Sequence, residues 1–99
     1  MTQEVDPIAL MQQGKYEAAR NGFKAQLEKN PTALNALHFY GMLSIILNNI
    51  ADGISYMSLS LSMAPDNSAF ISNTIQALGL LTHNKHSNAY KILNRQLMN

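Results

Sequence analysis

The chain has 99 residues, of which seven are Lys or Arg and six are Asp or Glu, so its formal net charge is +1. This length accommodates one small domain, and the balanced charge argues against the basic face of a nucleic-acid-binding protein. Cysteine is absent, which excludes disulfides and thiolate metal sites and favours a reducing, cytoplasmic location. No stretch approaches the roughly 20 apolar residues of a membrane span, and the charged N-terminal segment lacks the apolar run of a signal peptide. We therefore expect a soluble protein.

Two helices are predicted in the first third of the chain. Asp6 followed by Pro7 is typical of a helix N-terminus, so a short helix is expected over 7–13, and Gly14 ends it. The second helix carries an apolar stripe at spacings of three and four residues, with charged side chains on its other faces. The stripe consists of Tyr16, Ala19, Phe23 and Leu27. Pro31 ends this helix because the residue before a proline is forced out of the α region.

The third predicted helix, from a cap at Thr32 to about Leu47, is apolar around most of its circumference. Its large apolar residues are Leu34, Leu37, Phe39, Tyr40, Met42, Leu43, Ile45, Ile46 and Leu47. A helix of this kind must be buried on more than one face. We therefore expect it to contact more than one neighbouring helix.

Three further helices follow. Asn48 and Asn49 form a turn into a fourth helix over 50–63, which carries serines where charged residues would be usual. The apolar stripe of this helix is Ile50, Ile54, Met57 and Leu61. Asp66 and Asn67 cap a fifth helix, whose inward residues are predicted to be Phe70, Ile71, Thr74, Ile75, Leu78 and Leu81. A long turn over 82–85 leads to a sixth helix, which carries Ala89, Tyr90, Leu93 and Leu97.

The helix pairs repeat along the chain. Pro31 and Pro65 lie 34 residues apart. When the segments before them are aligned, large apolar residues match large apolar residues and small residues match small residues. A third, looser copy is displaced by 36 residues from the second, so its internal turn is longer. Gly41 in the third helix and small residues in the second helix of each pair allow close approach, to about 8 Å between axes. Those small residues are Ala19, Gly53 and Ala89.

This pattern resembles the tetratricopeptide repeat family over almost the entire chain. The repeat signature consists of Gly14, Tyr16, Ala19, Phe23, Pro31, Tyr40, Gly41, Gly53, Pro65 and Ala89. The middle copy departs from the family pattern at Ser44, Gly53 and Ser60, and the third copy lacks the closing proline. The resemblance implies an all-α fold, a right-handed solenoid of antiparallel helix pairs with about 2.5–3 repeats and about six helices. It implies one domain over 1–99, with repeats of about 1–31, 32–65 and 66–99.

The family's members are mostly protein-binding scaffolds, whose groove is lined by the first helix of each pair. The matching positions here are Asn35, His38, Phe39, Met42, Ile45, Ile46, Asn73 and Gln76, with Ser72, Gly79 and Leu80 as further candidates. This lining is apolar and rich in amides, and Met42 offers a flexible thioether suited to an adaptable surface. Lysine and arginine are missing from it, so the acidic C-terminal peptides that some family members hold are not expected as ligands.

Other chemistry has little support in the sequence. His83 and His86 could supply two metal ligands, but the nearest acidic residue in the sequence is Asp66, so we expect no metal site. No nucleophile elbow, P-loop or paired carboxylate is present, and we expect neither catalysis nor a cofactor. Between Pro31 and Thr82 the only charged side chains are Asp52 and Asp66, which indicates a surface that is covered by something.

Three hypotheses about function follow. The chain could associate with itself, forming a homodimer, because its centre is poor in charge and no polar capping helix follows Met98. It could be an adaptor whose groove binds a peptide or helix of another protein. It could also be the N-terminal targeting or substrate-positioning segment of a larger enzyme, because the runs 36–43 and 63–70 look like repeats that bacteria attach to glycosyltransferases. In the last case, it would contact a C-terminal region beyond residue 99.

Overall fold

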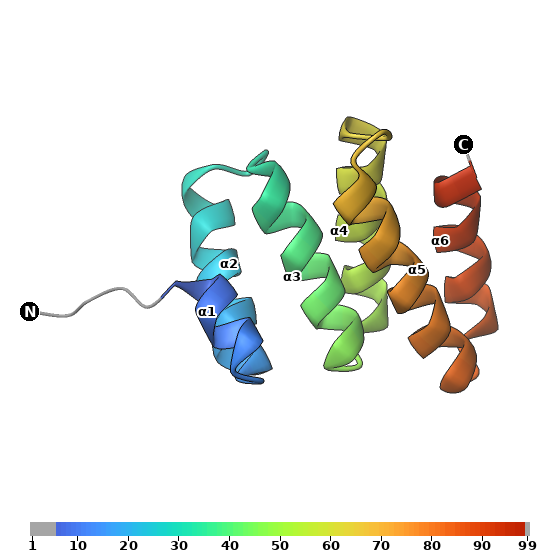
Figure 1. The fold of residues 1–99 in the computed structure, drawn as a ribbon, viewed down its shortest axis with the longest axis horizontal. Coiled ribbons are helices and arrows are strands. Elements are labelled where there is room, and N and C mark those ends of the chain that lie inside the picture. Colours follow the sequence, from blue (N-terminus) through green and yellow to red (C-terminus); the bar gives the residue numbers. More distant parts are fainter. Residues whose placement is uncertain (1–5, 99) are drawn as a thin grey trace, which may run out of the picture.

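The computed structural model describes residues 6–98, and these form six helices joined by short turns (Figure 1). The helices are α1 (Pro7–Gln12), α2 (Tyr16–Lys29), α3 (Leu34–Ile46), α4 (Ile50–Met63), α5 (Ser68–His83) and α6 (Ser87–Met98). The described part of the chain contains no strand, which confirms the all-α prediction. Residues 1–5 and 99, which belong to the first and third predicted repeats, lie outside the described residues.

Two of the predicted caps are present and one is wrong. The Asp6 side chain accepts a hydrogen bond from the backbone N–H of Ile8, and the Asn67 side chain accepts one from Phe70 at 3.1 Å. Thr32 does not cap α3, because its backbone N–H and hydroxyl both bond to the Asn30 side chain. The helix begins instead after Ala33, without a side-chain cap.

The turn between α5 and α6 is shorter than predicted. Thr82 and His83 complete the last turn of α5. The Thr82 hydroxyl donates a hydrogen bond to the backbone carbonyl of Leu78, four residues earlier in the same helix. The chain reverses through Lys85, whose φ of 62° lies in the left-handed region. Asn48, with a φ of 67°, occupies the same kind of position between α3 and α4. The two turns therefore use the same backbone conformation, and the extra residues lie in α5, which has 16 residues against 13 in α3.

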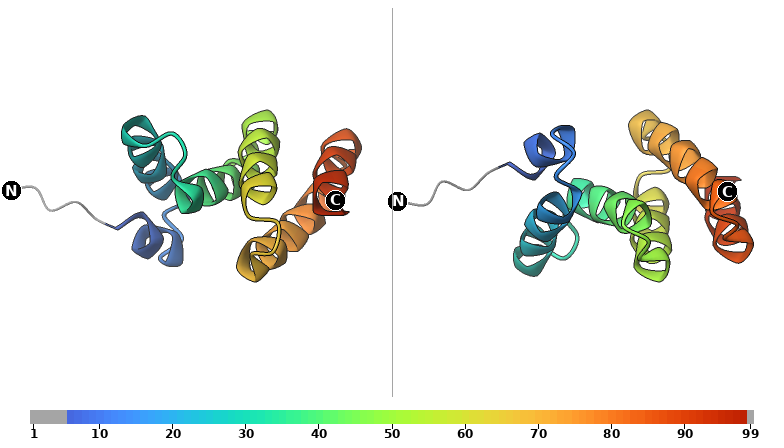
Figure 2. Two further views of the ribbon diagram at one scale, coloured as in Figure 1. Left: turned by 90° about the horizontal axis from the view of Figure 1, so that it is seen from above. Right: turned by 90° about the horizontal axis from the view of Figure 1, so that it is seen from below.

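Consecutive helices pack side by side, in an elongated molecule of 45 × 26 × 21 Å. Figure 2 shows α2, α4 and α6 along one side of the molecule, α1 and α5 along the other, and α3 between them. Helix α3 contacts α2, α4 and α5, as its apolar circumference predicted. Helix α5 contacts α3, α4 and α6, and helix α6 contacts α4 and α5, but neither contacts α1 or α2. Each end of the molecule is therefore attached only to the central pair.

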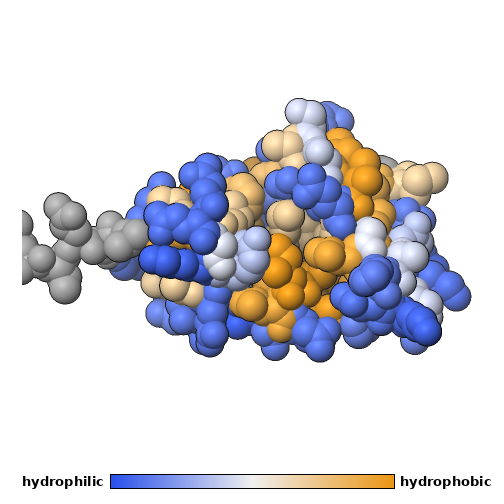
Figure 3. Space-filling model, turned by 60° about the horizontal axis from the view of Figure 1, so that its bottom comes forward, coloured by the Kyte–Doolittle hydropathy of each residue, from blue (hydrophilic) through white to orange (hydrophobic). Residues whose placement is uncertain are grey.

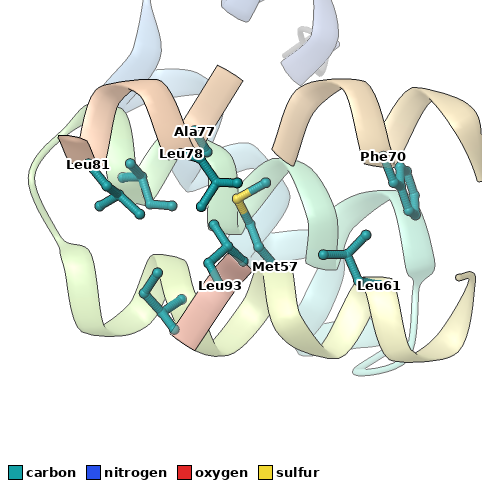
Figure 4. Packing of buried hydrophobic residues seen from close by; sticks show 9 residues of the cluster. Met57, Leu61, Phe70, Ala77, Leu78, Leu81 and Leu93 are labelled. Atoms are coloured by element: carbon teal, nitrogen blue, oxygen red, sulfur yellow. The ribbon is translucent and has the colours of Figure 1, made fainter. Parts of the chain in front are cut away.

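The core consists of two clusters of buried side chains, one toward each end. The N-terminal cluster joins α2 to α3 and consists of Ala19, Phe23, Ala36, Tyr40 and Leu43. The C-terminal cluster joins α3 and α4 to α5 and α6, and Figure 4 shows how its side chains interdigitate. Its members are Ile45, Ile54, Met57, Leu61, Phe70, Ala77, Leu78, Leu81 and Leu93. One inward prediction for α5 was wrong: Ile75 is 56% exposed, and Ala77 is buried.

Gly41 and Gly53 bring α3 and α4 into the close contact that the sequence predicted. A Cβ atom on Gly41 would lie 2.7 Å from both the backbone nitrogen and the Cγ of Met57. A Cβ atom on Gly53 would meet the Ile45 side chain and, at 2.9 Å, the Gly41 carbonyl oxygen. Real side chains do not approach this closely. The spacing of these two helices therefore requires glycine at both positions.

Candidate partner-binding surface

Helix α3 presents one stripe of accessible side chains, which we call the α3 surface: Asn35, Phe39, Met42 and Ile46. These residues are separated by four, three and four positions, so they lie on one face of the helix. Asn35 is exposed, and the other three are partly buried. All four were predicted to line a groove, and the structure brings them together on one surface.

The α3 surface lies over the boundary between the two core clusters. Phe39 and Ile46 pack against the N-terminal cluster, whereas Met42 packs against the C-terminal cluster. The Phe39 ring stacks on Phe23 with 5.5 Å between centroids and an interplanar angle of 24°. Such offset stacking fixes the ring while leaving part of it accessible. Figure 3 shows apolar side chains gathered in the middle of one face, between polar ends of the molecule. The α3 surface is therefore largely apolar, and the two core clusters beneath it fix the positions of its apolar side chains.

His38 and Ile45, which were also predicted to line the groove, belong to the core. Their exposed fractions are 0% and 3%. Both lie on the neighbouring stripe of α3, where α5 and α4 cover them. Ile45 packs into the C-terminal cluster beside Gly53. Neither side chain can contact a partner in this structure.

His38 is part of a buried polar contact between three helices. Its ring stacks on Phe70 of α5, with 4.0 Å between centroids and an angle of 11°. The Ser60 hydroxyl of α4 donates to the Met57 carbonyl, so it is left to accept from His38 Nδ1 at 3.3 Å. The Asn73 amide Nδ2 of α5 donates to His38 Nε2 at 3.1 Å. These partners select the neutral tautomer with its hydrogen on Nδ1. Burial lowers the pKa of His38 from 6.5 to about 4, because the charged ring would be desolvated.

The two predicted groove residues of α5 have different environments. Asn73 is partly buried, and its amide nitrogen is already bonded to His38. Gln76 is exposed. Asn73 therefore acts inside the protein, between helices, and only Gln76 offers its full amide to solvent.

The central helices carry very few charges on their surfaces. Asp52 lies 58% exposed on α4 and pairs with Arg20 of α2 across 3.3 Å. Arg20 also donates to the Ser44 hydroxyl at 2.8 Å, and its guanidinium lies 4.6 Å from the Tyr40 ring centre. Several large apolar side chains of α4 and α5 are exposed nearby in sequence: Leu59 and Met63 (45% each), Ile75 (56%) and Leu80 (37%).

A second surface feature is a shallow hollow of about 530 Å³ between α4 and α6. Its lining consists of Ile50, Ala51, Ile54, Ser55, Ser58, Ala89 and Ile92. None of these side chains is an acid, a base or a histidine, so the hollow offers no group for proton transfer. Within residues 6–98, no three His, Asp or Glu side chains are placed to hold a metal ion. In the same residues, none of the helices has the length and apolar character needed to cross a membrane.

No family model matches the chain, and no curated protein or solved structure matches it.

Proposed function

We propose that the chain is a non-catalytic protein–protein interaction scaffold of the tetratricopeptide type, in which the helix pairs form a right-handed stack. Helices α2 and α4 begin 34 residues apart, which is the spacing of Pro31 and Pro65 after the first two pairs, and α5–α6 forms a third, looser pair. The glycine contact between α3 and α4 supports the same proposal, because the small residues fall where the repeat pattern requires them.

The α3 surface is the observation that carries this function. It is uncharged and largely apolar, and three neighbouring helices hold α3 in place before any partner arrives. A preformed surface loses little conformational entropy on binding, so its contacts contribute more of their free energy to affinity. Asn35 and Gln76 add exposed amides that can bond to the backbone or side chains of a bound segment. We infer that the occupant is an uncharged, partly apolar segment of a protein, including another copy of this chain.

Sedimentation velocity over a concentration series tests the self-association part of the proposal. The wild-type chain should form a dimer, and the double variant Phe39→Glu with Met42→Glu should remain a monomer, because two buried carboxylates would lack partners. Asn21→Glu, on an exposed position of α2 outside the predicted groove, is the matched control and should leave the dimer intact. Circular dichroism must show that all three proteins keep their helices. A wild-type monomer at every concentration would refute self-association.

Affinity capture from cell extract tests binding to a different protein. The wild-type chain and the Asn21→Glu control should retain the same bound proteins, and the double glutamate variant should lose them. Equal capture by all three would show that binding does not use the α3 surface.

The exposed apolar side chains of the last helix pair favour a second proposal. Ile75 of α5 and Ile92 of α6 are 56% and 55% exposed. In a stack of helix pairs, such residues would be covered by a following element. The chain would then be the targeting or substrate-positioning segment of a larger enzyme, such as a glycosyltransferase. Reading the gene beyond codon 99 tests this, since a stop codon there would exclude it.

A further inference from the structure

The buried His38 contact lies where the C-terminal helix pair joins the rest of the molecule. Apart from their contact with each other, α5 packs on α3 and α4, and α6 packs on α4. These contacts consist of the C-terminal cluster and the bond between His38 of α3 and Asn73 of α5. The N-terminal cluster contains no residue of α5 or α6. Because α2 and α3 share the N-terminal cluster, and α4 contacts α3 closely at Gly41 and Gly53, the end pair can separate while these helices stay together.

Protonation of His38 would weaken the contact between α3 and α5. A hydrogen on Nε2 would point at the Asn73 amide nitrogen, which is itself a donor, so the present bond between α3 and α5 would be lost and the Asn73 amide would have to turn to offer its oxygen. The new charge would sit on a ring that is 0% exposed and stacked on Phe70. A buried charge of this kind is strongly unfavourable unless it is paired.

The helices around His38 bring no carboxylate to it. Helices α3 and α5 contain no acidic residue, and the basic groups of α6 are exposed. The only acid of α4 is Asp52, which is exposed and paired with Arg20. The acids of α2, Glu17 and Glu28, are also exposed. Asp66, in the turn before α5, is exposed as well. The imidazolium therefore has neutral hydrogen-bond partners but no carboxylate to pair with, and water can solvate its charge once α5 moves away.

We propose that His38 is a pH-sensitive joint, at which protonation separates α5 and α6 from α3 and α4 while α1–α4 remain folded. Separation would uncover the halves of the C-terminal cluster that belong to α3 and α4, including Ile45, Met57 and Leu61. The apolar surface available to a partner would then increase in acid.

The size of the effect follows from proton linkage. An opened joint exposes His38, whose pKa returns to 6.5 from about 4 in the closed form. The opened form therefore binds the proton more tightly, by about 300-fold. Between pH 7.5 and pH 5, the ratio of opened to closed molecules should rise by about 30-fold. The rise should level off below pH 4, where the closed form is protonated as well.

Amide hydrogen exchange by NMR tests the proposal on the intact chain. After correction for the intrinsic pH dependence of exchange, amides of α5 and α6 should lose about 30-fold protection between pH 7.5 and pH 5. At pH 5 they should exchange faster than the amides of α2 and α3, since the latter require global unfolding. The variant His38→Phe, which can still stack on Phe70, should abolish the pH-dependent loss. His83→Gln, at an exposed histidine, is the matched control and should behave as wild type.

Three results would overturn the proposal. One is equal protection of all helices at pH 5, which would mean that the chain opens only as a whole. Another is an unchanged loss of protection in His38→Phe, which would assign the pH dependence to other groups. The third is wild-type protection that does not change with pH. If His38→Phe fails to fold, His38→Gln replaces it, because its amide can bond to Ser60 and Asn73 and does not titrate.

Discussion

Replacing Gly41 with alanine tests whether close packing between α3 and α4 determines the fold. The added Cβ would lie 2.7 Å from the backbone nitrogen of Met57. A flexible side chain could move aside, but this contact is with the backbone of α4, so the two helices would have to move apart. Alanine also favours the helix, so the sign of the change depends on which effect is larger.

The two effects have different magnitudes. Alanine in place of glycine inside a helix contributes about 0.5–1 kcal/mol to stability. Overpacking of a well-packed core costs typically about 1–3 kcal/mol, and the backbone contact at Gly41 places this variant in the upper part of that range. We therefore expect Gly41→Ala to lower the free energy of unfolding by about 1–2 kcal/mol.

Gly79 of α5 provides a matched control for this experiment. It lies inside a helix, is exposed, and has nothing within 4 Å of the position that a Cβ would occupy. Gly79→Ala should therefore stabilise the protein by about 0.5–1 kcal/mol through helix propensity alone. Urea unfolding followed by circular dichroism measures both variants against wild type. If Gly41→Ala is as stable as Gly79→Ala, the close contact has no energetic importance and the reasoning is wrong.

Two further predictions concern the polar contacts that join the helices. His38 is neutral in the folded chain down to about pH 4 but takes up a proton near pH 6.5 when unfolded, so stability is complete above pH 6.5 and declines in acid. From pH 7 to pH 5, the free energy of unfolding in urea should fall by about 2 kcal/mol, and His38→Phe should show a smaller decline. Arg20→Met should destabilise the chain by about 1–2 kcal/mol, through loss of its contacts with Ser44 and Tyr40. Asp52→Asn should cost less than about 0.5 kcal/mol in the same thermal or urea assay, because that pair is exposed; equal effects of the two variants would contradict this account.

The sequence predicted much of the helix order because the signals for it are local. Pro31 and Pro65 end helices by steric exclusion within one or two residues, and the α4 boundaries agree with the predicted range of 50–63. The errors occurred where two local solutions compete. Thr32 could cap α3, yet it bonds to Asn30 instead. Two polar residues placed in a turn, Thr82 and His83, complete α5.

The candidate surface could be predicted only in part. Asn35, Phe39, Met42 and Ile46 could be assigned to one face from their spacing, and the structure places them there. His38 was assigned to the same region because its position matches the groove-lining positions of the tetratricopeptide pattern. The burial of His38 could have been inferred from the sequence. Helix α3 is apolar around most of its circumference, which left no exposed face for a histidine at that position. Its partners could not be found, because Asn73 lies 35 residues away in the sequence.

By itself, the sequence determined an all-helical chain, the positions of most helix ends, the repeated spacing and the need for glycine at Gly41. These depend on backbone sterics and on periodicity within a single helix. The tertiary structure alone decided that His38 and Ile45 are buried, that Ile75 is exposed, and that α5 and α6 join the molecule only through α3 and α4. Burial is a property of which helix covers which face, and that depends on the packing of side chains from distant segments, each of which is compatible with more than one neighbour.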